Sequence, residues 1–353
     1  MRDDDAPPRS PIPEGLRRMA RPLAAELDRA LGGELDDVLA HVEHALEDLI
    51  TGEGMPSGFH PDSHLAPGVP RIRPILVVLA TRAAGGEARN TGDAAFSAEL
   101  LHLAVGVHDA ALGRQGGRRR RVARRLMGGA VHWLGGNHLS LRALELARHA
   151  PAPEVLGEAL DTLREISEVQ ALAEDLRGRE PSERDYRDYA DGHTGSVFSF
   201  CTRAGGRLAG APRPVVTALG RYGRHMGVAW HTLEDHWSFS LGPEQLAMHL
   251  ARTTATGRPL LPLIRAMSVD PEVDALLDRV LAGGDADDTV QLNQRVVAAG
   301  GLFVTRRLVV EETLAARRAL RSLNPSPHRD ALERLARSLA ASGGRDALVE
   351  VTE

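Results

Sequence analysis

The sequence contains no lysine, so all 43 of its basic residues are arginines. It has one cysteine, Cys201, which rules out an internal disulfide and leads us to expect a reducing, cytoplasmic setting. Cys201 itself is expected to be a small buried core residue. No apolar run approaches the roughly 18 residues of a membrane-spanning helix, and the acidic start lacks the apolar core of a secretory signal. These absences exclude a disulfide scaffold and predict no membrane span.

The charge of the chain argues against a nucleic-acid partner. The formal net charge is -5, whereas broad binding to a phosphate backbone needs a positive surface. One dense cationic run, residues 118–125, contrasts with this balance. We expect this run to contact a small anion or solvent.

The hydrophobic spacing predicts helices almost throughout the chain. In residues 35–49, apolar side chains recur at steps of three and four residues, which is the period of one helix face. Glycine and proline clusters separate such stretches, and the alternating pattern of strands is absent. We therefore predict an all-α single domain of about a dozen helices over residues 14–345. Residues 1–13 are expected to be a disordered tail.

Two helical segments carry clustered polar groups. The first, residues 99–109, leads into the arginine run, and the second covers residues 222–237. In both, polar side chains lie beside small and apolar ones, which is typical of a helix face turned toward a cavity. A solvated helix end is the alternative.

These segments and their neighbours resemble the trans-prenyltransferases, the polyprenyl synthetases of the isoprenoid synthase fold. The likeness covers roughly residues 20–340 and implies a helical bundle around a central cavity. It rests on several motifs that follow one another in the family's order. They are Arg71-Ile72-Arg73-Pro74 (GKRLRP in the family), Glu99 to Asp109 (the helix of the first aspartate-rich motif), Gly192 to Gly195 (KTG), Trp230 to Asp235 (FQxxDD) and Gly257 to Pro262 (GKxTLP).

The resemblance implies a reaction and a set of site residues. In that family, Mg²⁺ held between two DDxxD motifs ionises an allylic diphosphate, whose carbocation then alkylates a homoallylic diphosphate. Hard cations with oxygen ligands suit this leaving group. By this likeness Asp109, Glu234 and Asp235 are the metal ligands. The implied diphosphate-binding residues are Arg71, His102, Arg118, Arg119, His193, Thr194, His231 and Arg258.

The sequence departs from the family mainly in the metal-binding half. Asp109 is the only acid left in the first motif; Glu234 and Asp235 remain in the second, where Ser238 takes the last position. The basic residues implied for diphosphate binding largely persist, and arginine suits bidentate phosphate contact. The pattern therefore predicts that diphosphate binding is retained while Mg²⁺-dependent ionisation is weakened.

Three interpretations remain open. A non-catalytic or regulatory subunit would bind prenyl diphosphates and form a homodimer, or a heterodimer with an active prenyl diphosphate synthase. An active atypical prenyltransferase or isoprenyl-synthase-type terpene synthase would hold Mg²⁺ with the three remaining acids. In the transferase, Ala104 and Val105 would line the floor of the chain-length tunnel by family analogy. A transition-metal site would instead use His193, His231 and Asp235, since imidazole with carboxylate suits such ions.

Overall fold

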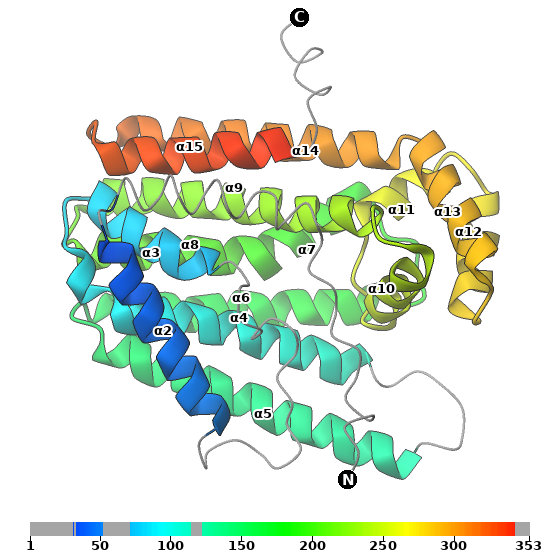
Figure 1. Cartoon of the computed structure of the whole chain (residues 1–353), viewed down its shortest axis with the longest axis horizontal. Coiled ribbons are helices and arrows are strands. Elements are labelled where there is room, and N and C mark those ends of the chain that lie inside the picture. The colour runs from blue at the N-terminus through cyan, green and yellow to red at the C-terminus, as the bar shows by residue number, and fades with distance from the viewer. Residues whose placement is uncertain (1–30, 32, 52–70, 114–121, 343–353) are drawn as a thin grey trace, which may run out of the picture.

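The structure is a computed structural model that describes residues 31, 33–51, 71–113 and 122–342. The described part of the chain is all-helical, as predicted, and most of its long helices lie side by side in layers (Figure 1). The predicted tail at residues 1–13 lies outside it, as do Arg118 and Arg119. Among the described helices, none has the length and apolar character to cross a membrane.

The helices follow the breaks that glycine and proline predict. In chain order they are α2 (Glu34–Thr51), α3 (Ile72–Ala83), α4 (Gly92–Gly113), α5 (Val122–His149), α6 (Glu154–Leu176), α7 (Glu183–Ala190), α8 (Ser196–Leu208), α9 (Arg213–Ser238), α10 (Pro243–Ala255), α11 (Leu261–Met267), α12 (Glu272–Leu281), α13 (Ala286–Ala298), α14 (Gly301–Ala319) and α15 (Pro327–Ser342). A five-residue π-helical turn, η4 (Asp191–Gly195), joins α7 to α8 without a break.

Helix α8 is the centre of the bundle. It packs against α3, α4, α6 and α9, and most of its residues are buried, as expected for a helix with neighbours on every side. Cys201 lies here with no exposed surface and donates to the carbonyl of Val197, and burial raises the pKa of its thiol. The prediction of a buried core cysteine is confirmed.

Helices α10 to α13 form a smaller unit at one end of the bundle (Figure 1). They share an apolar cluster that includes Phe239, Leu250 and Leu276. This unit is held to the end of α9, since the amide of Asn293 donates to the carbonyl of Phe239 at 3.0 Å. The chain leaving α10 is thereby brought to the end of the bundle where α4 and α9 carry their acidic residues.

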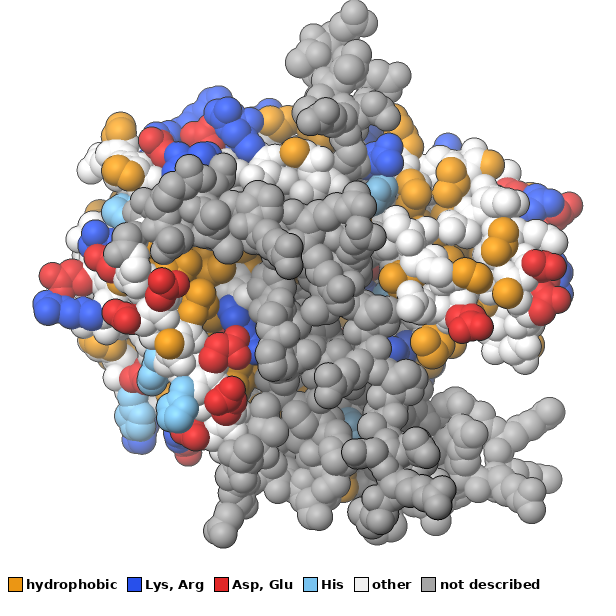
Figure 2. All heavy atoms as spheres, viewed as in Figure 1, with side chains coloured by type: hydrophobic (Ala, Val, Ile, Leu, Met, Phe, Trp, Pro, Cys, Tyr) orange, Lys and Arg blue, Asp and Glu red, His pale blue; other side chains and the backbone are white. Residues whose placement is uncertain are grey.

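The described surface mixes charges of both signs. On the face seen in Figure 2, acidic and basic side chains are interspersed over the bundle and over the α10–α13 end. Large apolar side chains are exposed on α5 and α6: Trp133, Leu134, Leu141 and Leu160 are 42, 59, 62 and 50% exposed. Helices α5 and α6 pack against each other, and large exposed apolar side chains on adjoining elements are typical of an interaction surface.

Candidate functional site

The two polar segments lie on α4 and α9, and the π-helical turn η4 connects them through side chains. His193 Nε2 of η4 is 3.0 Å from Asp109 Oδ2 on α4. The next residue, Thr194, places its hydroxyl 2.8 Å from His231 Nδ1 on α9. Short π-helical turns are frequent at functional sites because they shift side chains out of the α-helical register. One continuous polar chain therefore crosses from the first motif to the second.

Asp109 has both carboxylate oxygens engaged by protein groups. Gln170 on α6 donates to Oδ1 at 3.0 Å, and His193 contacts Oδ2. Burial acts to raise the pKa of Asp109, but the charge and hydrogen bond of His193, with the hydrogen bond of Gln170, outweigh it and hold the pKa below its usual range. Asp109 is consequently ionised at neutral pH.

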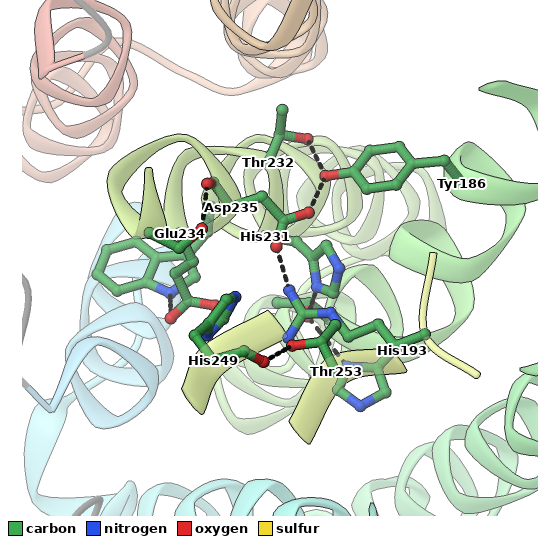
Figure 3. A network of polar contacts seen from close by, with 12 residues as sticks. Tyr186, His193, His231, Thr232, Glu234, Asp235, His249 and Thr253 are labelled. Carbon is green, nitrogen blue, oxygen red and sulfur yellow. Dashed lines mark hydrogen bonds and ion pairs between the residues drawn. The ribbon is translucent and has the colours of Figure 1, made fainter. Parts of the chain in front are cut away.

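Asp235 is completely buried, and both its oxygens also have partners. The guanidinium of Arg258 donates to Oδ1 and the Tyr186 hydroxyl donates to Oδ2 at 2.8 Å (Figure 3). Burial raises the pKa of Asp235 to about 6, although Arg258 and Tyr186 act in the opposite direction. At neutral pH the carboxylate is ionised and forms an ion pair with Arg258.

The third predicted metal ligand, Glu234, accepts a hydrogen bond at 2.8 Å from the indole of Trp230. Mg²⁺ requires oxygen ligands converging on one point. Within the described ranges, no group of three or more histidine, cysteine or acidic side chains is placed to hold a metal ion. As placed, neither Asp109, Glu234 and Asp235 nor the alternative trio His193, His231 and Asp235 fits a metal centre.

Arg258 reaches the site because of the residue before it. Gly257 ends α10 with a left-handed φ of 72°, a conformation that favours glycine. A Cβ at this position would lie 2.2 Å from the carbonyl oxygen of Ala173 on α6. Gly257 is thus required both for the turn and for its close packing against α6.

Three buried nitrogen atoms, one in Arg258 and two in nearby histidines, have no hydrogen-bond partner among the described residues. Nε of Arg258 and Nε2 of His231 and His249 are buried and make no hydrogen bond with the described part of the chain. Burial, reinforced by the charge of Arg258, lowers the pKa of both histidines, to about 4 for His249, so both rings are neutral at pH 7. Buried polar atoms normally have partners. The site therefore has unused polar capacity suited to the oxygen atoms of a ligand.

Comparison with known proteins decides the family. The sequence profile of the family described as Polyprenyl synthetase matches residues 61–298. The chain belongs to the polyprenyl synthetase family. Octaprenyl diphosphate synthase of Escherichia coli (strain K12) is 28% identical over 275 residues, which are 76% of this chain and 84% of that protein. Heptaprenyl diphosphate synthase component 2 of Geobacillus stearothermophilus is 28% identical over 255 residues, 71% of this chain and 79% of that one.

The solved structures agree with this assignment. The crystal structure of a decaprenyl diphosphate synthase from Rhodobacter capsulatus superimposes with a TM-score of 0.70 at 25% identity, covering 89% of this chain and 98% of that one. The resemblance inferred from the ordered motifs is confirmed, and so is the all-α isoprenoid synthase fold. This polyprenyl synthetase family member belongs to isoprenoid biosynthesis, in a family that normally uses Mg²⁺.

The sequence also predicts Arg71, His102, Arg118 and Arg119 as diphosphate-binding residues. Arg71 immediately precedes α3 and forms an ion pair with Glu43 of α2 at 2.6 Å. His102 is half-buried on α4, seven residues before Asp109. Arg118 and Arg119 lie outside the described residues. Their role in binding diphosphate stays a prediction.

Sequence reasoning missed four residues of the polyprenyl synthetase site: Gln170, Tyr186, Tyr189 and His249. The ring of Tyr189 stacks on His193, with 5.1 Å between ring centroids. A signal for the tyrosines existed, because the chain has only three tyrosines and two of them precede the His193 element at helical spacing. Gln170 and His249 had no such signal, since nothing in their local sequence distinguishes them from surface residues.

Proposed function

We propose that this chain binds a prenyl diphosphate at the Arg258 site through protein cations, and that its Mg²⁺-dependent ionisation is impaired. It would then act as a non-catalytic or regulatory subunit. The observation that carries this proposal is the pairing of Arg258 with Asp235. A magnesium ion needs accessible carboxylate oxygens, whereas those of Asp109 and Asp235 are held by protein donors.

The diphosphate would be bound by the guanidinium of Arg258 and the imidazole of His193. The Arg258 side chain is 21% exposed and keeps Nε without a partner. His193 is 12% exposed and is oriented by Asp109. Guanidinium groups contact phosphate oxygens through parallel hydrogen bonds, so a fixed arginine substitutes for part of the charge that a metal ion would supply.

The prenyl chain would extend from this site along α4. Val105, four residues before Asp109, forms a small apolar cluster with Ile166 and Val197. The preceding residue, Ala104, is also fully buried. Small side chains at these two positions support the proposal that they border the space for the prenyl chain.

A second chain would bind to the apolar surface of α5 and α6. The exposed Trp133, Leu134, Leu141 and Leu160 support such an interface. One relative is named as component 2 of a heptaprenyl diphosphate synthase, and this name supports pairing with a different, active subunit as well as with a second copy. We propose a dimer of one of these two kinds.

A second candidate function is an active, atypical prenyltransferase or an isoprenyl-synthase-type terpene synthase. The observation that favours it is the ionised carboxylate of Asp109, whose pKa His193 and Gln170 hold low, because a Mg²⁺ ion that displaced His193 would supply the positive charge in its place. The names of the similar proteins, which are synthases, also favour this candidate.

Product analysis separates the two candidates. The purified protein is incubated with geranyl, farnesyl and geranylgeranyl diphosphates, each with and without isopentenyl diphosphate and Mg²⁺, and released diphosphate and products are measured by mass spectrometry. The first proposal expects no release, together with a rise in melting temperature on adding a prenyl diphosphate in EDTA. Mg²⁺-dependent release would establish the second candidate.

A further inference from the structure

A second cationic site lies in a pocket of about 550 Å³ between α8 and α9. It shares no residue with the Arg258 site. The residues that line it are Ser199, Arg203, Arg207, Arg213, Val216, Thr217, Gly220, Arg221 and Arg224. Five of the nine are arginines, and Val216 is the only apolar side chain among them.

Helical spacing brings these side chains together. Arg203 and Arg207 are four residues apart on α8, and Arg213, Thr217 and Arg221 follow the same step on α9, so each set forms one ridge of its helix. Gly220 lets the two helices approach: a Cβ there would lie 2.7 Å from Cγ of Arg203. The stem of Arg203 consequently packs against the backbone of α9 at Gly220.

Three of the arginines are held in place by carboxylates of neighbouring elements. Glu158 of α6, only 5% exposed, binds Arg203 at 2.5 Å and Arg207 at 3.0 Å. Arg224 binds two acids, Glu165 at 2.5 Å and Asp191 at 2.7 Å. The pocket therefore has a preorganised wall of guanidinium groups whose geometry does not depend on a ligand.

The other two arginines of the pocket are free to bind a ligand. Arg213 and Arg221 are exposed on α9 and make no ion pair or hydrogen bond with the described part of the chain. Five guanidinium groups facing three carboxylates leave an excess of two positive charges in this pocket. Hydroxyl groups of Ser199 and Thr217 supply further hydrogen-bonding capacity.

We propose that this pocket is a second anion site that binds a phosphate-bearing group with at least two negative charges. Arginine forks match phosphate oxygens, and the excess charge matches a phosphate monoester or an inorganic diphosphate. Val216 is the only apolar side chain among the described residues of the lining, so we expect the ligand to be recognised mainly through its phosphate group. The proposal does not depend on the function proposed for the Arg258 site.

Calorimetric titration of the full chain with inorganic diphosphate in EDTA tests this site. The key variant is Arg213→Gln/Arg221→Gln. The matched control is Arg318→Gln/Arg321→Gln, which changes one exposed arginine in the last turn of α14 and one just after it. Arg258→Gln removes the other candidate site. We expect a binding component that weakens at least about tenfold in the Arg213→Gln/Arg221→Gln variant, because two charge-assisted contacts are lost. That component persists in the control and in Arg258→Gln.

A second arm distinguishes the source of the phosphate. Vesicles containing phosphatidylglycerol are sedimented with the wild type and with the same variants. Vesicle binding that is lost only in the Arg213→Gln/Arg221→Gln variant assigns the pocket to a lipid headgroup, and diphosphate binding without vesicle binding assigns it to a free anion. If this variant binds both probes as the wild type does, or if the wild type binds neither, the proposal is wrong.

Discussion

The guanidinium of Arg258 donates to the buried carboxylate of Asp235, on the helix of the second acidic motif, and its charge also helps to lower the pKa of Asp109 on the first. One arginine thus stabilises a negative charge on each of the two motif helices. Its position explains how Asp235 stays buried, and how Asp109 and Asp235 stay ionised at neutral pH, without an inorganic cation.

Diphosphate binding should strengthen as the pH falls through the pKa of Asp235. This pKa is raised by burial to about 6, so Asp235 takes up a proton between neutral and mildly acidic pH and no longer neutralises Arg258. We expect the affinity for a prenyl diphosphate to rise about tenfold between about pH 7.5 and pH 5, the effect of one removed like charge at close range.

The control for this pH dependence is Asp235→Asn, which has no proton to take up at this position. Titrating both proteins at each pH cancels the protonation of the ligand itself. An Asp235→Asn variant with the same pH dependence as the wild type would show that another group is responsible.

Removing the cation of the Arg258–Asp235 pair should destabilise the fold. In Arg258→Met the buried carboxylate has lost its partner, and the free energy of unfolding should fall by about 3–5 kcal/mol at neutral pH. Arg258 lowers the folded-state pKa of Asp235, so its removal raises this pKa above the wild-type value of about 6, and the loss should shrink as the pH falls toward about 6 and stay constant below it. Urea unfolding at several pH values measures this.

The double variant Arg258→Met/Asp235→Asn separates an unpaired charge from a simple loss of packing. It should recover most of the stability, because no buried charge remains. Arg318→Met, at an exposed position, should change the stability by less than about 0.5 kcal/mol. Equal losses in the single and double variants would contradict the ion-pair explanation.

Magnesium should have little effect on the free protein. The oxygens of Asp109 and Asp235 are occupied by protein donors, so millimolar Mg²⁺ should leave the melting temperature within the scatter of a Ca²⁺ or EDTA control. A ligand that binds the folded state stabilises it by mass action. A concentration-dependent rise with Mg²⁺ that disappears in Asp109→Asn would show a metal site built on that acid.

Charging the apolar surface of α5 and α6 should break the proposed dimer. Leu134 and Leu141 are 59 and 62% exposed, and arginine at both positions would place two charges in the interface. We expect Leu134→Arg/Leu141→Arg to be a folded monomer by analytical ultracentrifugation and circular dichroism. Val269→Arg/Val297→Arg, at positions about equally exposed elsewhere, is the control and should keep the wild-type association state. Identical association of all three proteins would place the interface elsewhere.

The fold and its motif residues could be predicted from the sequence because both depend on local patterns. Helical periodicity and glycine or proline breaks predicted the all-α bundle, and the ordered motifs predicted that residues 99–109 and 222–237 face one site. His193, His231 and Arg258 were expected at that site, and the polar contacts of Asp109, Thr194 and Asp235 connect them to it.

The hydrogen bonds that hold Asp109 and Asp235 could not be predicted, because their donors come from helices far away in the sequence. Gln170 reaches Asp109 from α6, and Tyr186 reaches Asp235 from α7, over 61 and 49 residues of sequence. No local spacing encodes such pairs. The π-helical turn η4 likewise packs against α6 and α9, and His193 within it contacts Asp109 across 84 residues of sequence.

Equilibrium binding of geranylgeranyl diphosphate in EDTA tests the account most directly, with the wild type and Arg258→Gln compared by calorimetry. The account predicts that the wild type binds without metal and that the variant, checked for folding by circular dichroism, binds at least about tenfold more weakly. A wild type that binds only when Mg²⁺ is added, or a variant that binds in EDTA as tightly as the wild type, would contradict it.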